Sequence, residues 1–255
     1  MHESDGGERC VAFDNLRSEI GGKMDKKGKL IIMEAGDASG KATQTRFLYE
    51  HLMNDGRNVT RVSFPDYGSD SSALVRMYLR GDFGAQAADV DAYAASAFFA
   101  VDRYASFHTK WGVEYRRGGI ILSDRYTTSN LAHQAVKLVD EKARQEYFSW
   151  LEDFEYGRLG LPRPDLVVFL DMPPEASDRL LAARAKEKGK ADIHEKDKDY
   201  LHRVHDVYAE VAKQFGWTRI VCGNGATPRR PEEIAEDVYR VVFPVLDGKG
   251  TDAYD

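Results

Sequence analysis

The stretch that decides the fold is EAGDASGKATQ, residues 34–44. It approaches the phosphate-binding P-loop pattern, which is G-x-x-x-x-G-K-[ST]. Gly40 and Lys41 fit this pattern, whereas Ala35 replaces its first glycine and Ala42 replaces its hydroxyl residue. Glycine allows a backbone to approach a phosphate closely, and lysine supplies a point charge. The stretch therefore indicates a nucleotide-binding loop with two substitutions.

The flanking sequence places this loop at a strand-to-helix turn. Residues 29–34 are an apolar run typical of a buried strand, and residues 41–55 have a helical pattern. At such a turn, backbone N–H groups and the positive end of the helix dipole face an anion. We predict that the donor nucleotide's phosphates contact Ala38, Ser39, Gly40, Lys41, Ala42 and Thr43.

Four further apolar runs follow, beginning at Val59, Gly119, Leu166 and Arg219. Their near-continuous Ile, Val and Leu content is typical of strands that are covered on both faces, as in a parallel sheet. Helical patterns lie between the runs. The alternation predicts a three-layer α/β fold of the P-loop NTPase type, with a five-stranded parallel sheet flanked by helices. In such a fold the ligand binds at the carboxyl ends of the strands.

The composition narrows the class of protein. The 255 residues are 42% hydrophobic with a net charge of −6, which argues against general nucleic-acid binding. No apolar run approaches the ~18 residues of a membrane helix, and the start lacks a secretory-signal pattern. Cys10 and Cys222 form no disulfide framework. We expect a soluble, cytoplasmic protein with one domain at 29–246 and poorly ordered tails at 1–28 and 247–255.

The substitution at Ala42 bears on metal binding. Alanine cannot ligate magnesium, and the hydroxyl of Thr43, one residue later, faces another way. Magnesium would then be held by nucleotide phosphates, water and nearby carboxylates, which suits its reluctance to dehydrate. The available carboxylates are Asp37 in the loop and Asp124 at the end of the third apolar run, acting directly or through water. This pattern favours a kinase that binds two nucleotides over an NTPase switch.

Five segments of the chain resemble the thymidylate kinase family of nucleoside monophosphate kinases. The loop matches the family pattern E-G-x-D-x-x-G-K-x-T-Q, in which the residue after lysine varies. The other four segments follow in order: FPDY (64–67), FFAVDR (98–103), DRYTTSNLAHQ (124–134) and LPRPDLVVFLDMPPE (161–175). The resemblance covers residues 29–246. It implies transfer of the ATP γ-phosphoryl group to dTMP, with magnesium, a homodimer and a mobile lid at about 184–197.

The resemblance also implies which residues contact dTMP. Phe99 and Arg103 lie one helical turn apart, so thymine can stack on Phe99 while Arg103 reaches the base or phosphate. The amides of Asn130 and Gln134 match the donor and acceptor groups of thymine. The full predicted set is Asp37, Phe64, Tyr67, Phe99, Arg103, Arg125, Ser129, Asn130 and Gln134. Asp66 stands where many family members have arginine, and this removes a phosphate contact.

Catalysis is assigned to residues that position and neutralise phosphates. Arg125 follows the third strand, and its guanidinium suits the bridging of donor and acceptor phosphates. Lys41 supplies charge from the loop, and Asp37 orients a sugar hydroxyl or a metal-bound water. The resemblance places Arg184 in the lid, where it stabilises charge on the moving phosphoryl group.

Two other interpretations stay open. In the first, the chain is a related phosphotransferase: a deoxynucleoside kinase or a kinase of a different pyrimidine monophosphate. In the second, it is a noncatalytic nucleotide-binding homologue. A nucleoside acceptor needs a base to activate its hydroxyl, whereas FPDY and the tyrosine after Asp124-Arg125 favour a monophosphate. Ala42 and Asp66 are the features that favour a noncatalytic homologue.

Overall fold

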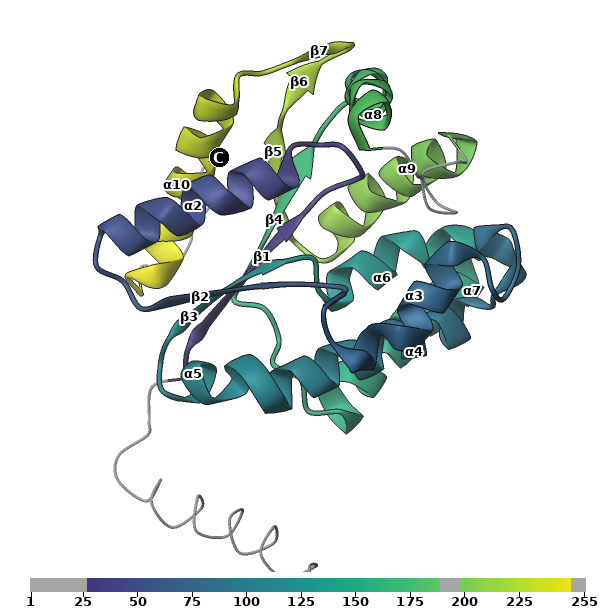
Figure 1. The fold of residues 1–255 in the computed structure, drawn as a ribbon, viewed down its shortest axis with the longest axis horizontal. Helices are drawn as coiled ribbons and strands as arrows, with labels where there is room; N and C mark the ends of the chain where they lie inside the picture. Colours follow the sequence, from purple (N-terminus) through teal and green to yellow (C-terminus); the bar gives the residue numbers. More distant parts are fainter. Residues whose placement is uncertain (1–26, 189–197, 249–255) are drawn as a thin grey trace, which may run out of the picture.

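A computed structural model describes residues 27–188 and 198–248. At its centre lies a five-stranded, all-parallel sheet in the order β2-β3-β1-β4-β5 (Figure 1). The strands are β1 (Lys29–Glu34), β2 (Val59–Ser63), β3 (Ile120–Asp124), β4 (Leu166–Asp171) and β5 (Thr218–Val221). The predicted P-loop NTPase-type sheet is confirmed, and each predicted apolar run contributes one strand. Cys222 lies one residue beyond β5 and is fully buried.

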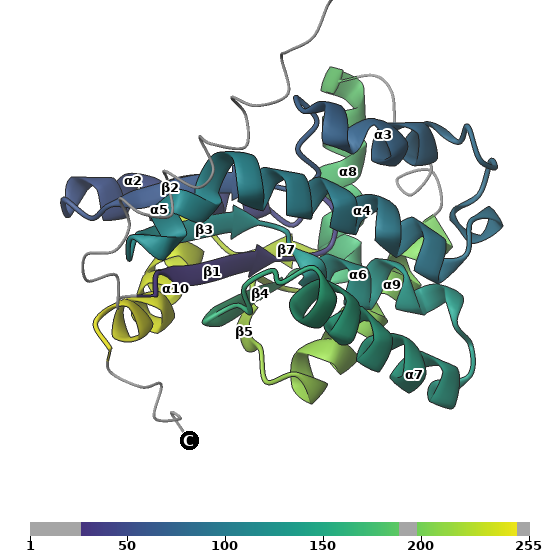
Figure 2. The same cartoon turned by 90° about the horizontal axis from the view of Figure 1, so that it is seen from below.

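Helices connect the strands and cover both faces of the sheet (Figures 1 and 2). The α-helices are α2 (Lys41–Asn54), α3 (Ala73–Arg80), α4 (Ala92–Ser106), α5 (Gly112–Arg116), α6 (Thr127–His133), α7 (Glu141–Glu152), α8 (Pro174–Lys188), α9 (Lys198–Gln214) and α10 (Pro231–Leu246). Two further segments, η3 (Phe107–Trp111) and η5 (Asp153–Arg158), are π-helical. The 3₁₀ turns are η1 (Asp70–Ser72), η2 (Ala87–Asp89) and η4 (Ala135–Lys137).

A short antiparallel pair, β6 (Gly223–Asn224) and β7 (Thr227–Pro228), precedes α10 and was not predicted. The helix α9 lies between β4 and β5, where a helical pattern was predicted, and α10 follows β7. Among residues 27–188 and 198–248, no helix has both the length and the apolar character needed to cross a membrane. The lid residues 189–197 and most of the two predicted tails lie outside the described residues.

The side chains of β1 alternate between two apolar layers. Ile31 and Met33 belong to the layer formed with α2 and α10, whereas Leu30 and Ile32 belong to the layer that contains Trp111. Successive side chains of a strand point to opposite faces, so an unbroken apolar run satisfies both layers. This burial fixes β1, which leads directly into the phosphate loop, in the middle of the sheet.

The register of the strands brings the polar residues to one edge. Met33 of β1 and Ser63 of β2 both lie opposite Asp124 at the end of β3. Because the strands are parallel, the residues that follow each of them emerge on the same side. The loop after β1 therefore lies beside Asp124 and Arg125, although more than 80 residues separate them in the chain.

We predict that Gly112→Ala destabilises the protein. A Cβ atom at this position would lie 2.3 Å from the carbonyl oxygen of Phe107, a backbone atom of the π-helical turn η3. Overpacking of this kind costs about 1–3 kcal/mol of unfolding free energy. Alanine gains only ~1 kcal/mol over glycine in a helix, so we expect the cost to be the larger effect. Urea denaturation measures the change. In the control Gly68→Ala, the nearest atom to the added Cβ is 4.0 Å away, so equal stability of both variants would contradict the prediction.

Candidate active site

The phosphate loop joins β1 to α2. Gly40, directly before α2, has the left-handed φ angle of 78° that favours glycine. The Ser39 hydroxyl donates a hydrogen bond of 2.6 Å to the carbonyl oxygen of Gly36 and closes the loop. The first turn of α2 has no acidic residue, so the positive end of this helix is not neutralised by its own sequence. The loop therefore suits an anion.

Two basic side chains lie at this edge, and each pairs with a carboxylate. The ammonium of Lys41 pairs with Asp124, and the guanidinium Nη2 of Arg125 donates to Asp37 Oδ1 at 2.6 Å. Burial and the neighbouring Arg125 lower the pKa of Lys41 below its usual value. Burial alone would also lower the pKa of Arg125. The neighbouring Tyr208, Asp37 and Glu34 outweigh burial, so the pKa of Arg125 lies above its usual value.

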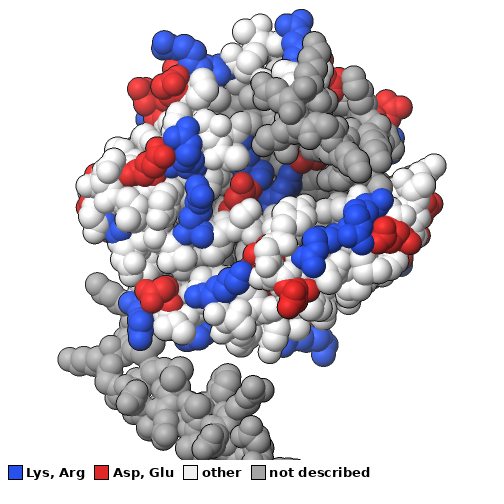
Figure 3. All heavy atoms as spheres, viewed as in Figure 1, with Lys and Arg blue, Asp and Glu red and all other residues white. Residues whose placement is uncertain are grey.

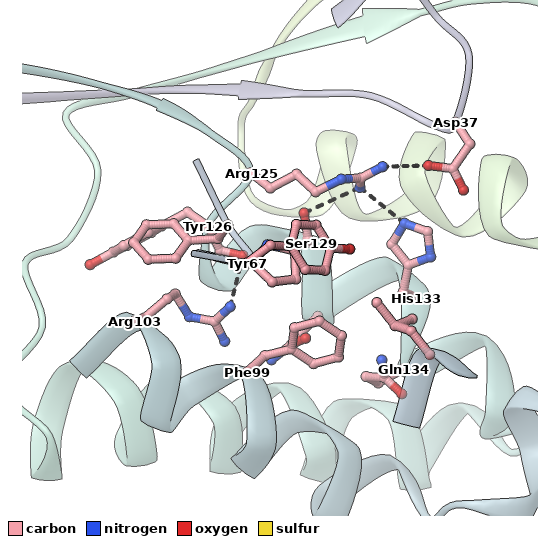
Figure 4. A pocket seen from close by; sticks show the side chains of 13 residues that line it. Asp37, Tyr67, Phe99, Arg103, Arg125, Tyr126, Ser129, His133 and Gln134 are labelled. Atoms are coloured by element: carbon pink, nitrogen blue, oxygen red, sulfur yellow. Dashed lines mark hydrogen bonds and ion pairs between the residues drawn. The ribbon is translucent and has the colours of Figure 1, made fainter. Parts of the chain in front are cut away.

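The predicted nucleotide-binding residues line two adjoining cavities. All the residues predicted to contact dTMP line one cavity of about 100 Å³ between the loop after β2, α4 and α6 (Figure 4). All the residues predicted to contact donor phosphates line a second, larger cavity of about 550 Å³, together with Asp124. Asp37 and Arg125 line both cavities. Figure 3 shows acidic and basic side chains side by side in a hollow near the middle of this face.

The smaller cavity contains a buried amide. Gln134 is fully buried, and neither its amide nitrogen nor its amide oxygen has a hydrogen-bond partner among the described residues. Buried polar groups are normally paired, because each unpaired group costs about 1–3 kcal/mol. Figure 4 shows Gln134 below His133 and beside Phe99. The amide therefore fits a ligand that presents both an acceptor and a donor.

Phe99 and Arg103 share the cavity, but their side chains are held differently. Phe99 is half-buried and packs edge-on against Tyr78, with 6.2 Å between ring centroids. The guanidinium of Arg103 is buried and forms a two-pronged ion pair with Glu155, whose Oε2 accepts from Nε at 2.7 Å. Glu155 also accepts a hydrogen bond of 2.6 Å from the Thr127 hydroxyl. Arg103 therefore lies in a fixed orientation beside the cavity.

The comparisons with known proteins identify the family. The sequence model of the thymidylate kinase family matches residues 33–230. The chain is 35% identical over 205 residues to thymidylate kinase of Mycobacterium tuberculosis, covering 79% of this chain and 94% of that protein. The chain belongs to the thymidylate kinase family. It is also similar to a probable thymidylate kinase of Pyrobaculum aerophilum, at 26% identity over 85% of this chain and 97% of that protein.

The similarity extends to a eukaryotic thymidylate kinase. Over 161 residues the chain is 29% identical to thymidylate kinase of Caenorhabditis elegans, covering 60% of this chain and 66% of that protein. Two of the matched segments, the phosphate loop and FPDY, meet at the larger cavity of the structure. Residues of FFAVDR and DRYTTSNLAHQ line the smaller cavity beside it, so four of the five segments contribute to the two cavities.

Asp66, which departs from the usual thymidylate kinase pattern, has a defined structural place. Its carboxylate pairs with Lys110 of η3 and accepts a hydrogen bond of 2.9 Å from the Ser69 hydroxyl. Its backbone N–H donates to the buried carboxylate of Asp102 at 2.7 Å. Burial alone would raise the pKa of the Asp66 carboxyl, but its contacts with Lys110 and Ser69 outweigh burial and lower the pKa below its usual value. Asp66 therefore fixes the loop that carries Phe64 and Tyr67, instead of contacting phosphate as an arginine would.

Among the residues of the site, His133, Glu155 and Tyr208 were not predicted, and Glu34 was given no role although it is part of the matched loop pattern. The His133 ring lies 3.1 Å from Arg125 Nη1 through its Nε2 atom, and Figure 4 shows it between Gln134 and Arg125. Its position one turn after Ser129 was a usable signal. Glu155 lies more than 50 residues from its partner Arg103, and no local pattern marks it. Arg184 lies in α8, but its side chain is outside the described residues.

We predict that Glu155→Ala is strongly destabilising. Removal of one partner from a buried ion pair leaves an uncompensated charge, which costs roughly 3–5 kcal/mol of unfolding free energy. The matched control is Glu152→Ala, because Glu152 accepts a hydrogen bond of 2.6 Å from Arg163 at the surface. An exposed pair of this kind contributes about 0–1 kcal/mol. Urea denaturation of both variants measures the difference, and similar losses would contradict the assignment of Glu155 to a buried ion pair.

Proposed function

We propose that the protein transfers the γ-phosphoryl group of ATP to dTMP and releases ADP and dTDP. One observation carries this proposal: the two cavities share a boundary formed by Asp37 and Arg125 together with Phe64, Pro65 and Tyr67. A donor and an acceptor bound in these cavities would face each other through their phosphates. Membership of the thymidylate kinase family supports the choice of ATP and dTMP as the two substrates.

ATP binds through its phosphates at the loop before α2. The backbone amides around Ala38, Ser39 and Gly40 and the N-terminus of α2 supply hydrogen bonds and positive potential. Lys41 adds a full charge near the β- and γ-phosphates. Asp124 pairs with Lys41 in the structure, and nucleotide phosphates would take over this function on binding.

dTMP binds with its base in the smaller cavity. Thymine stacks on Phe99, and the amide of Gln134 pairs with the donor and acceptor groups of the ring. Asn130 approaches Ser96 and Glu155 only at 3.4–3.5 Å, so its amide is also available to the base. Arg103 lies on the same side, oriented by Glu155. The 5′-phosphate then reaches Arg125 at the junction of the cavities.

The reaction needs charge and positioning more than it needs a base. The second pKa of a phosphate monoester is ~6, so an oxygen of the dTMP phosphate is already anionic near pH 7. That oxygen attacks the γ-phosphorus of ATP, and the bond to the β–γ bridging oxygen breaks. Lys41, Arg125 and the loop amides stabilise the charge that is transferred. Asp37 orients Arg125, with which it forms an ion pair. We retain Arg184 as a further source of positive charge.

Magnesium fits the carboxylates of this site. Asp37 and Asp124 both line the larger cavity, and hard carboxylate oxygens are ligands that magnesium prefers. Within the described residues, no group of three or more His, Cys, Asp or Glu side chains is arranged to hold a metal ion. Asp37 and Asp124 would therefore hold the ion together with water and nucleotide phosphates. When bound, magnesium neutralises phosphate charge during transfer.

We also propose a homodimer that uses the outer face of α4. Val101 and Tyr104 are 49% and 41% exposed and lie one turn apart on this helix. Leu74 of α3 is 42% exposed, and α3 packs on α4. An apolar face of this kind is typical of an association surface. The cytoplasmic location remains a prediction from the sequence.

The test of the proposed function is an ADP-release assay with dTMP, dUMP, dCMP and thymidine as acceptors. We expect dTMP to be the best acceptor, with kcat/KM for dUMP about 10–200-fold lower, because one methyl group contributes about 1–3 kcal/mol in a pocket. Preference for thymidine would indicate a deoxynucleoside kinase. Absence of turnover with tight nucleotide binding would indicate a noncatalytic homologue.

We predict that Lys41→Ala and Arg125→Ala each lower kcat by about 10²–10³, a typical loss for one group that stabilises transition-state charge. The dissociation constant of dTMP, measured by calorimetry, should change far less. Lys142→Ala is a matched control, because the Lys142 side chain is 84% exposed and lies on α7, outside the cavities. Near-normal turnover in either of the first two variants would refute their catalytic assignment.

A further inference from the structure

Arg125 has a backbone conformation that needs external support. Its φ angle is 67°, a left-handed value that residues with a side chain rarely adopt. Such a conformation persists only where the surrounding structure fixes it, and it is common at functional sites. Here the Arg125 N–H donates to the carbonyl oxygen of Met33 at 3.1 Å, and the Ser123 hydroxyl donates to the Arg125 carbonyl.

Glu34 fixes the chain on the other side of Arg125. This residue ends β1, is fully buried and lines neither nucleotide cavity. Its Oε1 atom accepts a hydrogen bond of 3.3 Å from the backbone N–H of Tyr126. The hydroxyl groups of Thr128 and Ser129 also donate to this carboxylate. Glu34 therefore holds the N-terminal turn of α6, where Arg125 enters the site.

Tyr208 connects Glu34 with the guanidinium of Arg125. The phenol lies on α9, is fully buried and stacks on Phe169 with 5.4 Å between ring centroids. Its hydroxyl lies 3.0 Å from Glu34 Oε2 and 3.2 Å from Arg125 Nη1. An ionised carboxylate only accepts and a guanidinium only donates, so the direction of both bonds is determined. The hydroxyl donates its proton to Glu34 and accepts from Arg125.

The contact between the Tyr208 hydroxyl and Arg125 holds one side of the guanidinium. Nη1 of Arg125 is shared among Tyr208, His133 at 3.1 Å and Ser129 at 3.5 Å, while Nη2 contacts Asp37. A hydroxyl that is itself held by a buried carboxylate is a better-fixed acceptor than a freely rotating one. Burial raises the pKa of Tyr208 well above its usual value, so the phenol keeps its proton at neutral pH.

We propose that Tyr208, oriented by Glu34, is a positioning residue that holds the Arg125 guanidinium at the junction of the two cavities. This inference rests on the proposed function and extends it to a buried residue that touches neither nucleotide cavity. Of the two partners of the Tyr208 hydroxyl, Glu34 and Arg125, only Arg125 lines the nucleotide cavities. Loss of its hydroxyl should therefore matter only while position 125 carries a guanidinium.

A double-mutant cycle of Tyr208→Phe and Arg125→Lys tests this inference. Tyr208→Phe keeps the ring that packs on Phe169, and we expect kcat/KM for dTMP to fall roughly tenfold or more, as for loss of a hydrogen bond to a charged group. The double variant should be no more than about twofold worse than Arg125→Lys alone, because both changes remove the same contact. The matched control is Tyr239→Phe, which loses a 3.1 Å hydrogen bond to the Phe47 carbonyl; neither residue lines a nucleotide cavity.

Rates are normalised to the dTMP-binding stoichiometry, and circular dichroism confirms folding. Should Tyr208→Phe be partly unfolded, the cycle is run at low temperature on the folded fraction. Additive losses in the double variant, or a Tyr208→Phe enzyme that behaves like Tyr239→Phe, would overturn the inference while leaving the proposed function intact. A wild-type chain with no phosphoryl transfer to dTMP would overturn both.

Discussion

Two cations that repel each other share one edge of the sheet, and the arrangement of the site follows from this constraint. Lys41 and Arg125 lie close enough for Arg125 to lower the pKa of Lys41. Both side chains are largely buried, so each needs a counter-charge. Asp124 and Asp37 supply it. The parallel register places all four groups together, because β1 and β3 end side by side.

The pairing of these two cations with two carboxylates also explains how a kinase can function with a phosphate loop that lacks a magnesium-binding hydroxyl. An incoming phosphate offers the cations a stronger partner than a carboxylate does, since it carries more charge and more acceptor oxygens. Asp37 and Asp124 are then available to a metal ion or its water ligands. Ala42 is therefore compatible with phosphoryl transfer, because Asp37 and Asp124 line the same cavity as the loop and would take the place of the missing ligand.

Local sequence patterns predicted the scaffold and the phosphate loop, whereas the resemblance to the thymidylate kinase family supplied the predicted residues of the smaller cavity. The apolar runs located β1 to β5 because burial on both faces leaves a continuous signal, and Gly40-Lys41 marked the loop. The supporting residues were not predictable in the same way. Glu34, Glu155 and Tyr208 act through partners distant in the chain, such as the Tyr208–Glu34 contact across more than 170 residues. The sequence alone does not distinguish a buried carboxylate from a surface carboxylate, because the difference lies in the residues that surround it in the fold.

The central claim is that two nucleotides bind end to end, with Arg125 between their phosphates. The most direct measurement is calorimetric titration with one molecule in which adenosine and thymidine are joined 5′ to 5′ through a chain of five phosphates. We expect one molecule per chain, an affinity well above that of either nucleotide alone, and competition by both ATP and dTMP. Binding that ATP displaces but dTMP leaves unchanged would contradict the account, because the thymidine would then lie outside the cavity lined by Phe99 and Gln134.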